Sequence, residues 1–300
     1  MFRLPKKQHR PLFGILFMLL GTISISIADA IGKWLTADYP FIQGAWLRSL
    51  IGVILIGMFA AYNGMLPQLK TSKPGWHGFR SLLTSIAIIL IFYGLKNIPL
   101  AEFTAIIFAT PFFIAALSSR FLEDGVSKQE WLAIVIGFIG ILIVLRPTPD
   151  HFHIAHLTTL VAAACLGILF VSARHLTATE STLSLNFYLH VVNSVVCIYP
   201  AVSSWVMPSL TDAFLFFALA LAGTLGIGCA IQAVHYAKPS TVSPIDYVRL
   251  IWTTLLGYYL WKEMPAPLTW VGIVIIIISG VYIVRHARRI PEVGLEKESG

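Results

Sequence analysis

Ten apolar runs, each close to the length needed to cross a lipid bilayer, constrain this chain more than any other feature. A helix needs roughly 20 apolar residues, at about 1.5 Å each, to span about 30 Å of hydrocarbon. The runs leave almost no residues for a water-soluble domain, so we predict an all-α membrane protein with ten transmembrane helices. They cover residues 11 to 32, 41 to 62, 78 to 95, 99 to 121, 130 to 146, 155 to 173, 184 to 206, 212 to 235, 241 to 261 and 267 to 285.

The composition excludes the soluble and the disordered classes of protein. The chain is 57% hydrophobic and 12% charged, whereas soluble domains carry about a quarter of their residues as charged side chains. The three cysteines all lie in apolar runs and no CxxC pair occurs, so we expect neither a disulfide framework nor a metal site. A histidine cluster in the central link, His151, His153 and His156, is not expected to bind metal. No cofactor is predicted.

The net charge of +7 is a topology signal and does not indicate nucleic-acid binding. With an even number of spans both termini lie on one side, and that side receives 15 of the 21 Lys and Arg residues, Arg80 included. The opposite side receives four, and Arg48 and Arg249 lie within spans. We therefore expect both termini to be cytoplasmic.

The second half of the chain repeats the first. A shift of 140 residues places Pro99 on Pro239 and Glu123 on Glu263, just before and just after a span. Because five spans is an odd number, the second half must insert upside down. We predict two inverted five-helix repeats around a central cavity, with bounds at residues 1–148 and 149–286 and a cytoplasmic tail at residues 287–300.

Inverted repeats are typical of secondary transporters, in which two halves exchange conformations around one site. We predict such a transporter for a small organic metabolite (a vitamin, a nucleoside-like or an amino-acid-like molecule), driven by protons or by exchange. No Walker motif occurs. The alternatives are an intramembrane enzyme and a non-transport scaffold; HExxH and GxSxG motifs are absent, so we expect no enzyme.

Three stretches carry a resemblance to a known family. Residues 92 to 147 contain FYGLKNIPLAEFTAIIFATPFF, then LED, then GFIGILIVLRP, and a degraded copy follows as AKPSTVSPIDY. This pattern resembles the EamA-type carriers of the drug/metabolite transporter superfamily. The opening IADAIGKWLTADYPFIQGAWLRSL resembles a branch that includes riboflavin and S-adenosylmethionine carriers.

The resemblance implies a cavity lined by the first, third, fourth, sixth, eighth and ninth helices, with the fifth and tenth at the periphery. It also implies the bacterial inner membrane as location, a small-molecule substrate and membrane lipid as partners, and leaves a homodimer open.

Charged side chains inside spans are the strongest candidates for the site, because each costs about 2.5–3.5 kcal/mol to insert. Asp29 and Arg48 lie in the first two spans, and Asp246 and Arg249 in the ninth. They are interpreted either as a substrate site or as structural pairs, Asp29 with Lys33 along one helix and Asp246 with Arg249 along another.

Uncharged candidates share cavity-facing positions under the predicted topology. Pro111 and Pro244 are expected to break the fourth and ninth helices there and to expose backbone carbonyls to the cavity. The remaining candidate substrate-binding residues are Trp46, Tyr93, Phe108, Gln232, Tyr247 and Trp252.

Overall fold

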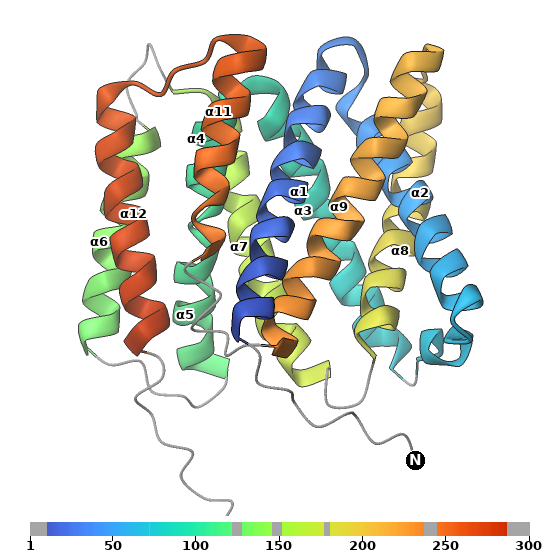
Figure 1. The fold of residues 1–300 in the computed structure, drawn as a ribbon, viewed down its shortest axis with the longest axis horizontal. Helices are drawn as coiled ribbons and strands as arrows, with labels where there is room; N and C mark the ends of the chain where they lie inside the picture. The colour runs from blue at the N-terminus through green and yellow to red at the C-terminus, as the bar shows by residue number, and fades with distance from the viewer. Residues whose placement is uncertain are drawn as a thin grey trace, which may run out of the picture.

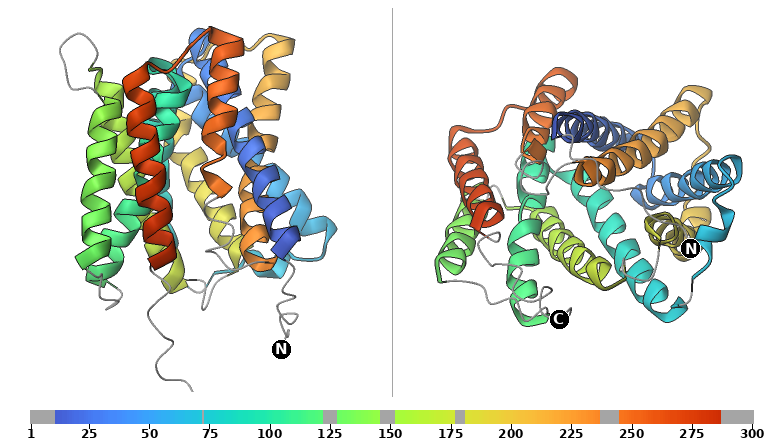
Figure 2. Two further views of the ribbon diagram at one scale, coloured as in Figure 1. Left: turned by 60° about the vertical axis from the view of Figure 1, so that its left-hand side comes forward. Right: turned by 60° about the horizontal axis from the view of Figure 1, so that its bottom comes forward.

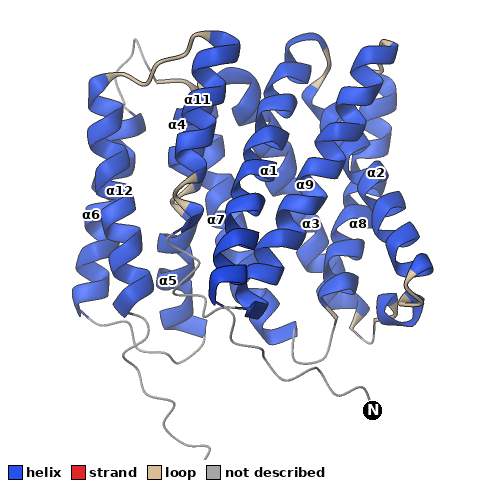
Figure 3. Cartoon of the chain, viewed as in Figure 1, coloured by secondary structure: helices blue, strands red, loops and turns tan. Residues whose placement is uncertain are grey.

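The computed structural model describes residues 11–71, 73–121, 128–145, 152–176, 181–236 and 245–286, and within these ranges the chain is helical with short links and no strand (Figure 3). The helices are α1 (Pro11–Asp38), α2 (Phe41–Tyr62), the short 3₁₀ helix η1 (Leu66–Leu69), α3 (Pro74–Asn97), α4 (Leu100–Ile107), α5 (Thr110–Phe121), α6 (Lys128–Leu145), α7 (Ile154–Leu176), α8 (Thr182–Ser203), α9 (Leu210–Tyr236), α11 (Arg249–Trp261) and α12 (Pro267–His286).

The predicted apolar runs all fall on helices, with differences in the bounds. In the described part of the chain, α1, α2, α3, α8 and α9 are long and apolar enough to cross a membrane by length and composition. The α4–α5 stretch, α6, α7 and α12 contain shorter apolar segments. The third helix begins at Pro74 and not at residue 78, because proline is well suited to the first helical turn.

The helices stand side by side as a bundle, and α1 begins at the same edge at which α12 ends (Figure 1). We call this the terminal edge, and we call the other the far edge. Helices from early in the chain pack chiefly on helices from late in the chain: α1 on α9, α3 on α7, α2 on α8 and α6 on α12. The α6–α12 pair lies at one end of the bundle (Figure 2).

Glycines bring two of these helix pairs into backbone contact. A Cβ added to Gly226 of α9 would lie 3.1 Å from the backbone nitrogen of Ile25 and 3.2 Å from the carbonyl oxygen of Gly21, both in α1. A Cβ on Gly272 of α12 would lie 2.6 Å from the carbonyl oxygen of Gly140 in α6. Small residues at such seams are typical of helices packed in lipid, where close contact replaces the hydrophobic effect.

The predicted fourth span, residues 99 to 121, is two helices. The turn lies at Phe108 and Ala109, just before Pro111, where a break was predicted. Proline has no N–H to donate to the carbonyl of Ile107, and the Thr110 hydroxyl donates to that oxygen instead, at 2.7 Å. The carbonyl of Ile107 at the helix break therefore has a hydrogen-bond donor within the protein.

In the described part of the predicted ninth span, residues 241 to 261, Ile245 and Asp246 are helical, a turn follows at Tyr247 and Val248, and α11 begins at Arg249. Residues 237–244, including Pro244, lie outside the described residues. A tight turn precedes α11, in which the Val248 amide donates to the Ile245 carbonyl at 2.9 Å. Figure 1 shows that α11 starts within the height of the bundle, so Arg249 stands at a helix start inside the protein.

The α1–α9 contact predicts a position-dependent effect of one substitution. Gly226→Leu should lower the stability by about 1–3 kcal/mol, because the side chain meets backbone that cannot give way. The control is Gly228→Leu on the same helix, since a Cβ there meets nothing within 4 Å. Thermal unfolding in detergent, followed by size-exclusion chromatography, measures both; equal midpoints for the two variants would contradict the packing described.

Candidate functional site

Two charged side chains from distant parts of the chain form an ion pair inside the bundle. Arg249, the first residue of α11, donates from Nη2 to Oδ2 of Asp29 in α1. The two side chains are only 12% and 9% exposed. A cation in the first turn of a helix is opposed by the helix dipole, so the Asp29 carboxylate compensates a charge that α11 by itself disfavours.

The two local pairings that the sequence suggested as structural alternatives do not form. Asp29 pairs with Arg249 and not with Lys33, and Arg249 does not bond Asp246. The Lys33 side chain points away from α1 and donates hydrogen bonds to Ile98 and Glu263, which belong to other elements at the far edge. Because the face of α1 that carries Asp29 meets α11, contact between helices replaces pairing along one helix.

Arg48 of α2 extends this pair into a cluster of charges. Its guanidinium lies against Gly223 of α9, where an added Cβ would be 3.1 Å from Nη2. The charges of Asp29 and Arg249 act on it, and it has no hydrogen-bond partner among the described residues. Asp246 also acts electrostatically on Arg249 and Asp29, again without a hydrogen bond to a described residue. We call Asp29, Arg48, Asp246 and Arg249 the ionic cluster.

His190 of α8 borders the ionic cluster, although it is not among the predicted site residues. Its Nδ1 atom is buried without a partner and faces Gly52 of α2, where an added Cβ would lie 2.9 Å away. The charge of Arg48 acts on His190. The neighbouring Asn193 is a packing residue, because its amide donates to the Ser49 hydroxyl at 2.6 Å. The small residue that faces His190 is Gly52 of α2, and this glycine was the feature of the sequence that could have pointed to the position.

Further polar atoms near this level are buried and have no partner. On α11 these include Arg249 Nε, Trp252 Nε1 and Thr254 Oγ1, and on α9 Thr224 Oγ1. Buried donors are nearly always satisfied in folded proteins. Their accumulation on two helices that contact α1 therefore favours a place where a polar ligand completes the hydrogen bonding.

Two predicted aromatic site residues lie apart from the ionic cluster. Trp46 packs edge to face on Trp205, with ring centroids 5.9 Å apart. Tyr93 contacts Phe41 edge to face at 5.7 Å and stacks on His153 at 6.5 Å. Both contacts involve residues at or next to the ends of helices, where aromatic side chains commonly form an interfacial belt.

Phe108, Tyr247 and Gln232 make the following contacts. Phe108 and Tyr247 pack together with centroids 4.9 Å apart, and Tyr247 also presses against Gly280 of the peripheral helix α12. The Tyr247 hydroxyl is buried without a partner. Gln232 of α9 is exposed and has no hydrogen bond to a described residue. Tyr247 directly follows Asp246 in the chain, and the charge of Asp246 acts on it.

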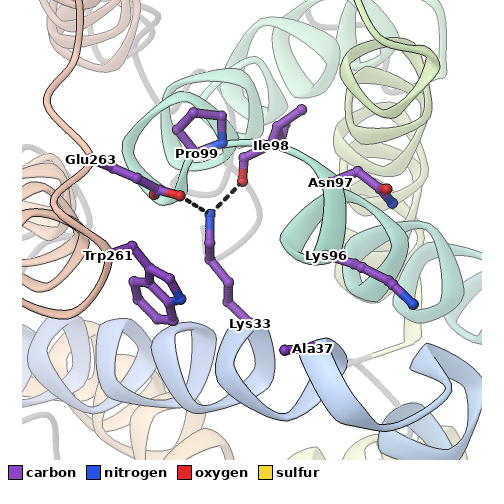
Figure 4. Close-up of a pocket in the computed structure, with 8 residues that line it drawn as sticks. All are labelled: Lys33, Ala37, Lys96, Asn97, Ile98, Pro99, Trp261 and Glu263. Atoms are coloured by element: carbon purple, nitrogen blue, oxygen red, sulfur yellow. Dashed lines mark hydrogen bonds and ion pairs between the residues drawn. The ribbon is translucent and has the colours of Figure 1, made fainter.

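A pocket of about 330 Å³ lies at the far edge, between the two parts of the chain (Figure 4). At its base Lys33 Nζ donates to the Glu263 carboxylate at 2.6 Å and to the Ile98 carbonyl at 2.8 Å. Glu263 also accepts from the Leu100 amide at 3.1 Å, which caps α4. Trp261 covers the ammonium group at 5.3 Å. We call the Lys33–Glu263 contact the far-edge latch.

The far edge carries a second set of contacts between the link after α1 and the link before α9. The Tyr39 hydroxyl donates to Asp212 at 2.7 Å, and this hydrogen bond raises the pKa of Tyr39. The Gln43 side chain bonds both backbone groups of Val206, at 2.8 and 3.0 Å. Together with the latch, these bonds join several elements at the far edge.

The histidine cluster of the central link is partly described, since His151 lies outside the described residues. His156 contacts Glu102 at 3.4 Å and its Nδ1 contacts the His153 carbonyl at 3.0 Å. Within the described residues, no group of three or more His, Cys, Asp or Glu side chains is arranged to hold a metal ion.

Comparison with known proteins identifies the fold and family. The chain matches the EamA-like transporter family over residues 12–146 and again over residues 153–285. A crystal structure of a protein with 18% sequence identity superposes with a TM-score of 0.63 and covers 91% of this chain and 98% of its own. That likeness concerns the fold alone.

Curated relatives cover nearly the whole chain. The S-adenosylmethionine uptake transporter of Rickettsia bellii is 30% identical over 92% of this chain and 94% of its own. The riboflavin transporter of Vibrio cholerae is 26% identical over 92% and 94%, and the pseudopaline exporter CntI of Pseudomonas aeruginosa is 24% identical over 91% and 96%. These names indicate transporters and not enzymes. The chain therefore belongs to the EamA-like transporter family and is a multi-pass membrane protein of the drug/metabolite transporter type.

Proposed function

We propose that this protein is a secondary transporter that moves a small zwitterionic metabolite, amino-acid-like or nucleoside-like, across the bacterial inner membrane by alternating access. The observation that carries the proposal is the ionic cluster, in which Asp29 and Arg249 join the early and late parts of the chain, while the Arg48 guanidinium beside them has no hydrogen bond to a described residue.

The ionic cluster has the chemistry needed for a zwitterion. An Arg48 guanidinium without a hydrogen-bond partner accommodates a substrate carboxylate through two parallel N–H donors. Asp246, also without a hydrogen bond to a described residue, accommodates a substrate ammonium group. Burial makes such bonds strong but makes unpaired charges costly, so a ligand with both charges fits the cluster better than a neutral one.

The relatives narrow the substrate class. S-adenosylmethionine carries a carboxylate and an ammonium group on one carbon, together with a sulfonium and a flat adenine ring. Riboflavin has the flat ring without that charged pair. The 30% identity to S-adenosylmethionine uptake transporters supports the zwitterionic class, and Trp252, with a buried free indole N–H, is our candidate for contact with a ring.

The helix contacts support two inverted repeats at residues 1–148 and 149–286. If each helix is exchanged with its counterpart five spans later, α1 on α9 becomes α7 on α3, and both contacts occur. The same exchange leaves the contacts α2–α8 and α6–α12 unchanged, because the two helices of each pair are counterparts of one another. Counting α4–α5 as one span and the stretch ending in α11 as another gives the ten transmembrane helices of the proposal.

The distribution of cations supports cytoplasmic termini, the 287–300 tail included. Arg80 is buried within α3, and leaving it out of the count changes the ratio of cations from 15 against 4 to 14 against 4. Asp29, Asp246 or Glu102 would carry a coupled proton. A homodimer through the peripheral helices α6 and α12 is part of the proposal, because both expose large apolar side chains.

We expect removal of one charge from the ionic cluster to abolish most transport. In proteoliposomes with labelled S-adenosylmethionine, Asp29→Asn and Arg48→Gln should each lower the initial uptake rate about tenfold or more, since a charge-assisted hydrogen bond contributes about 1.5–3 kcal/mol. The matched control is Asp38→Asn, an exposed carboxylate on the same helix.

Two outcomes separate the parts of this proposal. Near-wild-type uptake in both cluster variants would show that the ionic cluster is structural only. Uptake of riboflavin with no uptake of S-adenosylmethionine would reject the zwitterionic substrate class, but it would still support the proposal that the protein is a transporter.

The far-edge latch predicts that fixing it will stop alternating access. In a variant whose native cysteines, Cys165, Cys197 and Cys229, are replaced by serine, Lys33→Cys/Glu263→Cys should lose uptake when cross-linked, and a reductant should restore it. The pair joins α1 to the α11–α12 link and thus joins the two halves.

The control for this experiment is Ala37→Cys/Lys96→Cys. Both residues line the same pocket but belong to α1 and α3 of the first half. We expect its cross-linked form to keep its uptake. Full uptake with the Lys33/Glu263 cross-link in place would contradict the assignment of the far edge as a gate.

A further inference from the structure

An arginine near the terminal edge is buried without a partner of its own. Arg80 of α3 is 5% exposed, and its Nε and Nη1 atoms have no hydrogen-bond partner in the part of the chain that the structure describes. The hydroxyl of the adjacent Ser81 is fully buried and is also without a partner. Three donors at neighbouring positions of one helix are therefore unsatisfied.

The charge of Arg80 is not balanced by the described part of the chain. Among the described residues no carboxylate lies within ion-pair distance of it, in contrast to Arg249, which has Asp29. An uncompensated buried guanidinium is strongly unfavourable in a protein interior, and buried arginine normally has a carboxylate or phosphate partner. The missing partner is thus an anion with several acceptor oxygens.

The surroundings place this position at the seam of α3 and α8, close to the membrane surface. One turn before Arg80, His77 contacts the ring of Tyr188 in α8 with centroids 4.8 Å apart. Trp76 and Phe79, on other faces of the same turn, are 52% and 53% exposed and contact each other edge to face. Arg80 lies six residues after Pro74, about 9 Å along the helix.

We propose that the α3–α8 seam is an anion-binding site separate from the ionic cluster, in which Arg80 and Ser81 donate hydrogen bonds to a phosphate-type oxyanion. The anion is the headgroup of an acidic lipid or a soluble phosphate. The proximity of interfacial aromatic side chains matches the depth of lipid headgroups, and basic pockets between helices are known to hold acidic lipids. The site is independent of the proposed substrate.

The test uses the delipidated full-length protein in detergent. Its thermal midpoint is measured alone, with phosphatidylglycerol, with phosphatidylcholine and with inorganic phosphate. We expect phosphatidylglycerol or phosphate to raise the wild-type midpoint by roughly 3 °C or more at a tenfold excess over Kd, and phosphatidylcholine to have no such effect. The lipid response identifies a headgroup as the source, and the phosphate response identifies a soluble anion.

Arg80→Gln should remove this response while Lys70→Gln keeps it, because Lys70 is an exposed cation nearby and loses the same charge. Arg80→Lys, which keeps the charge without the fork of donors, should retain a reduced response. If Arg80→Gln does not fold, native mass spectrometry of the wild type decides whether phosphatidylglycerol or phosphate stays bound.

Two results would overturn the proposal. The first is an equal response of wild type and Arg80→Gln, or no anion bound to the wild type. The second is loss of stability in Glu180→Gln equal to that in Arg80→Gln with no anion response in the wild type. That result would identify Glu180, which precedes the described start of α8, as an internal partner for the arginine.

Discussion

The ion pair between Asp29 and Arg249 is the interaction on which the centre of this bundle depends. Lipid offers no solvent for a charge, so each ionised side chain inside a span must find its partner within the protein. Arg249 requires an anionic partner for a second reason: it is the first residue of α11, where the helix dipole disfavours a positive charge. A partner on α1 satisfies both requirements and ties early helices to late ones. Arg48 and Asp246 add one charge of each sign, which leaves the cluster formally neutral; our proposal of a zwitterionic substrate rests on this balance.

Close contact between helices makes this polar centre possible. At Gly21 and Gly226 the backbones of α1 and α9 touch, so α9 can present Gly223 to the guanidinium of Arg48. The seam of α6 and α12 uses glycine in the same way, at the other end of the bundle. The latch at Lys33 and Glu263 joins α1 to the link between α11 and α12 at the far edge. Close glycine contacts within pairs of helices, and a few polar bonds between the early and late parts of the chain, are the arrangement on which our proposal of alternating access rests.

Much of the architecture could be predicted from the sequence, because helix formation in lipid depends on local properties. Apolar runs of the right length give helices, Pro111 gives a break in the fourth, and the aromatic residues near helix ends give a belt. The errors were also local in origin. The start of the third helix lies at Pro74 and not at residue 78, so Arg80 stands further from the helix end than predicted; it was counted for topology, and its burial makes it a candidate anion site.

The sequence by itself determined which residues are charged inside a membrane and where the helices run, since both follow from hydropathy over about 20 residues. Only the tertiary structure decided the partners. Asp29 has Lys33 four residues away yet bonds Arg249, 220 residues along the chain, and Lys33 bonds Glu263. Side chains on a packed helix point at neighbouring helices, and which helix is the neighbour depends on how all the seams fit together. Spacing along one helix does not contain that information.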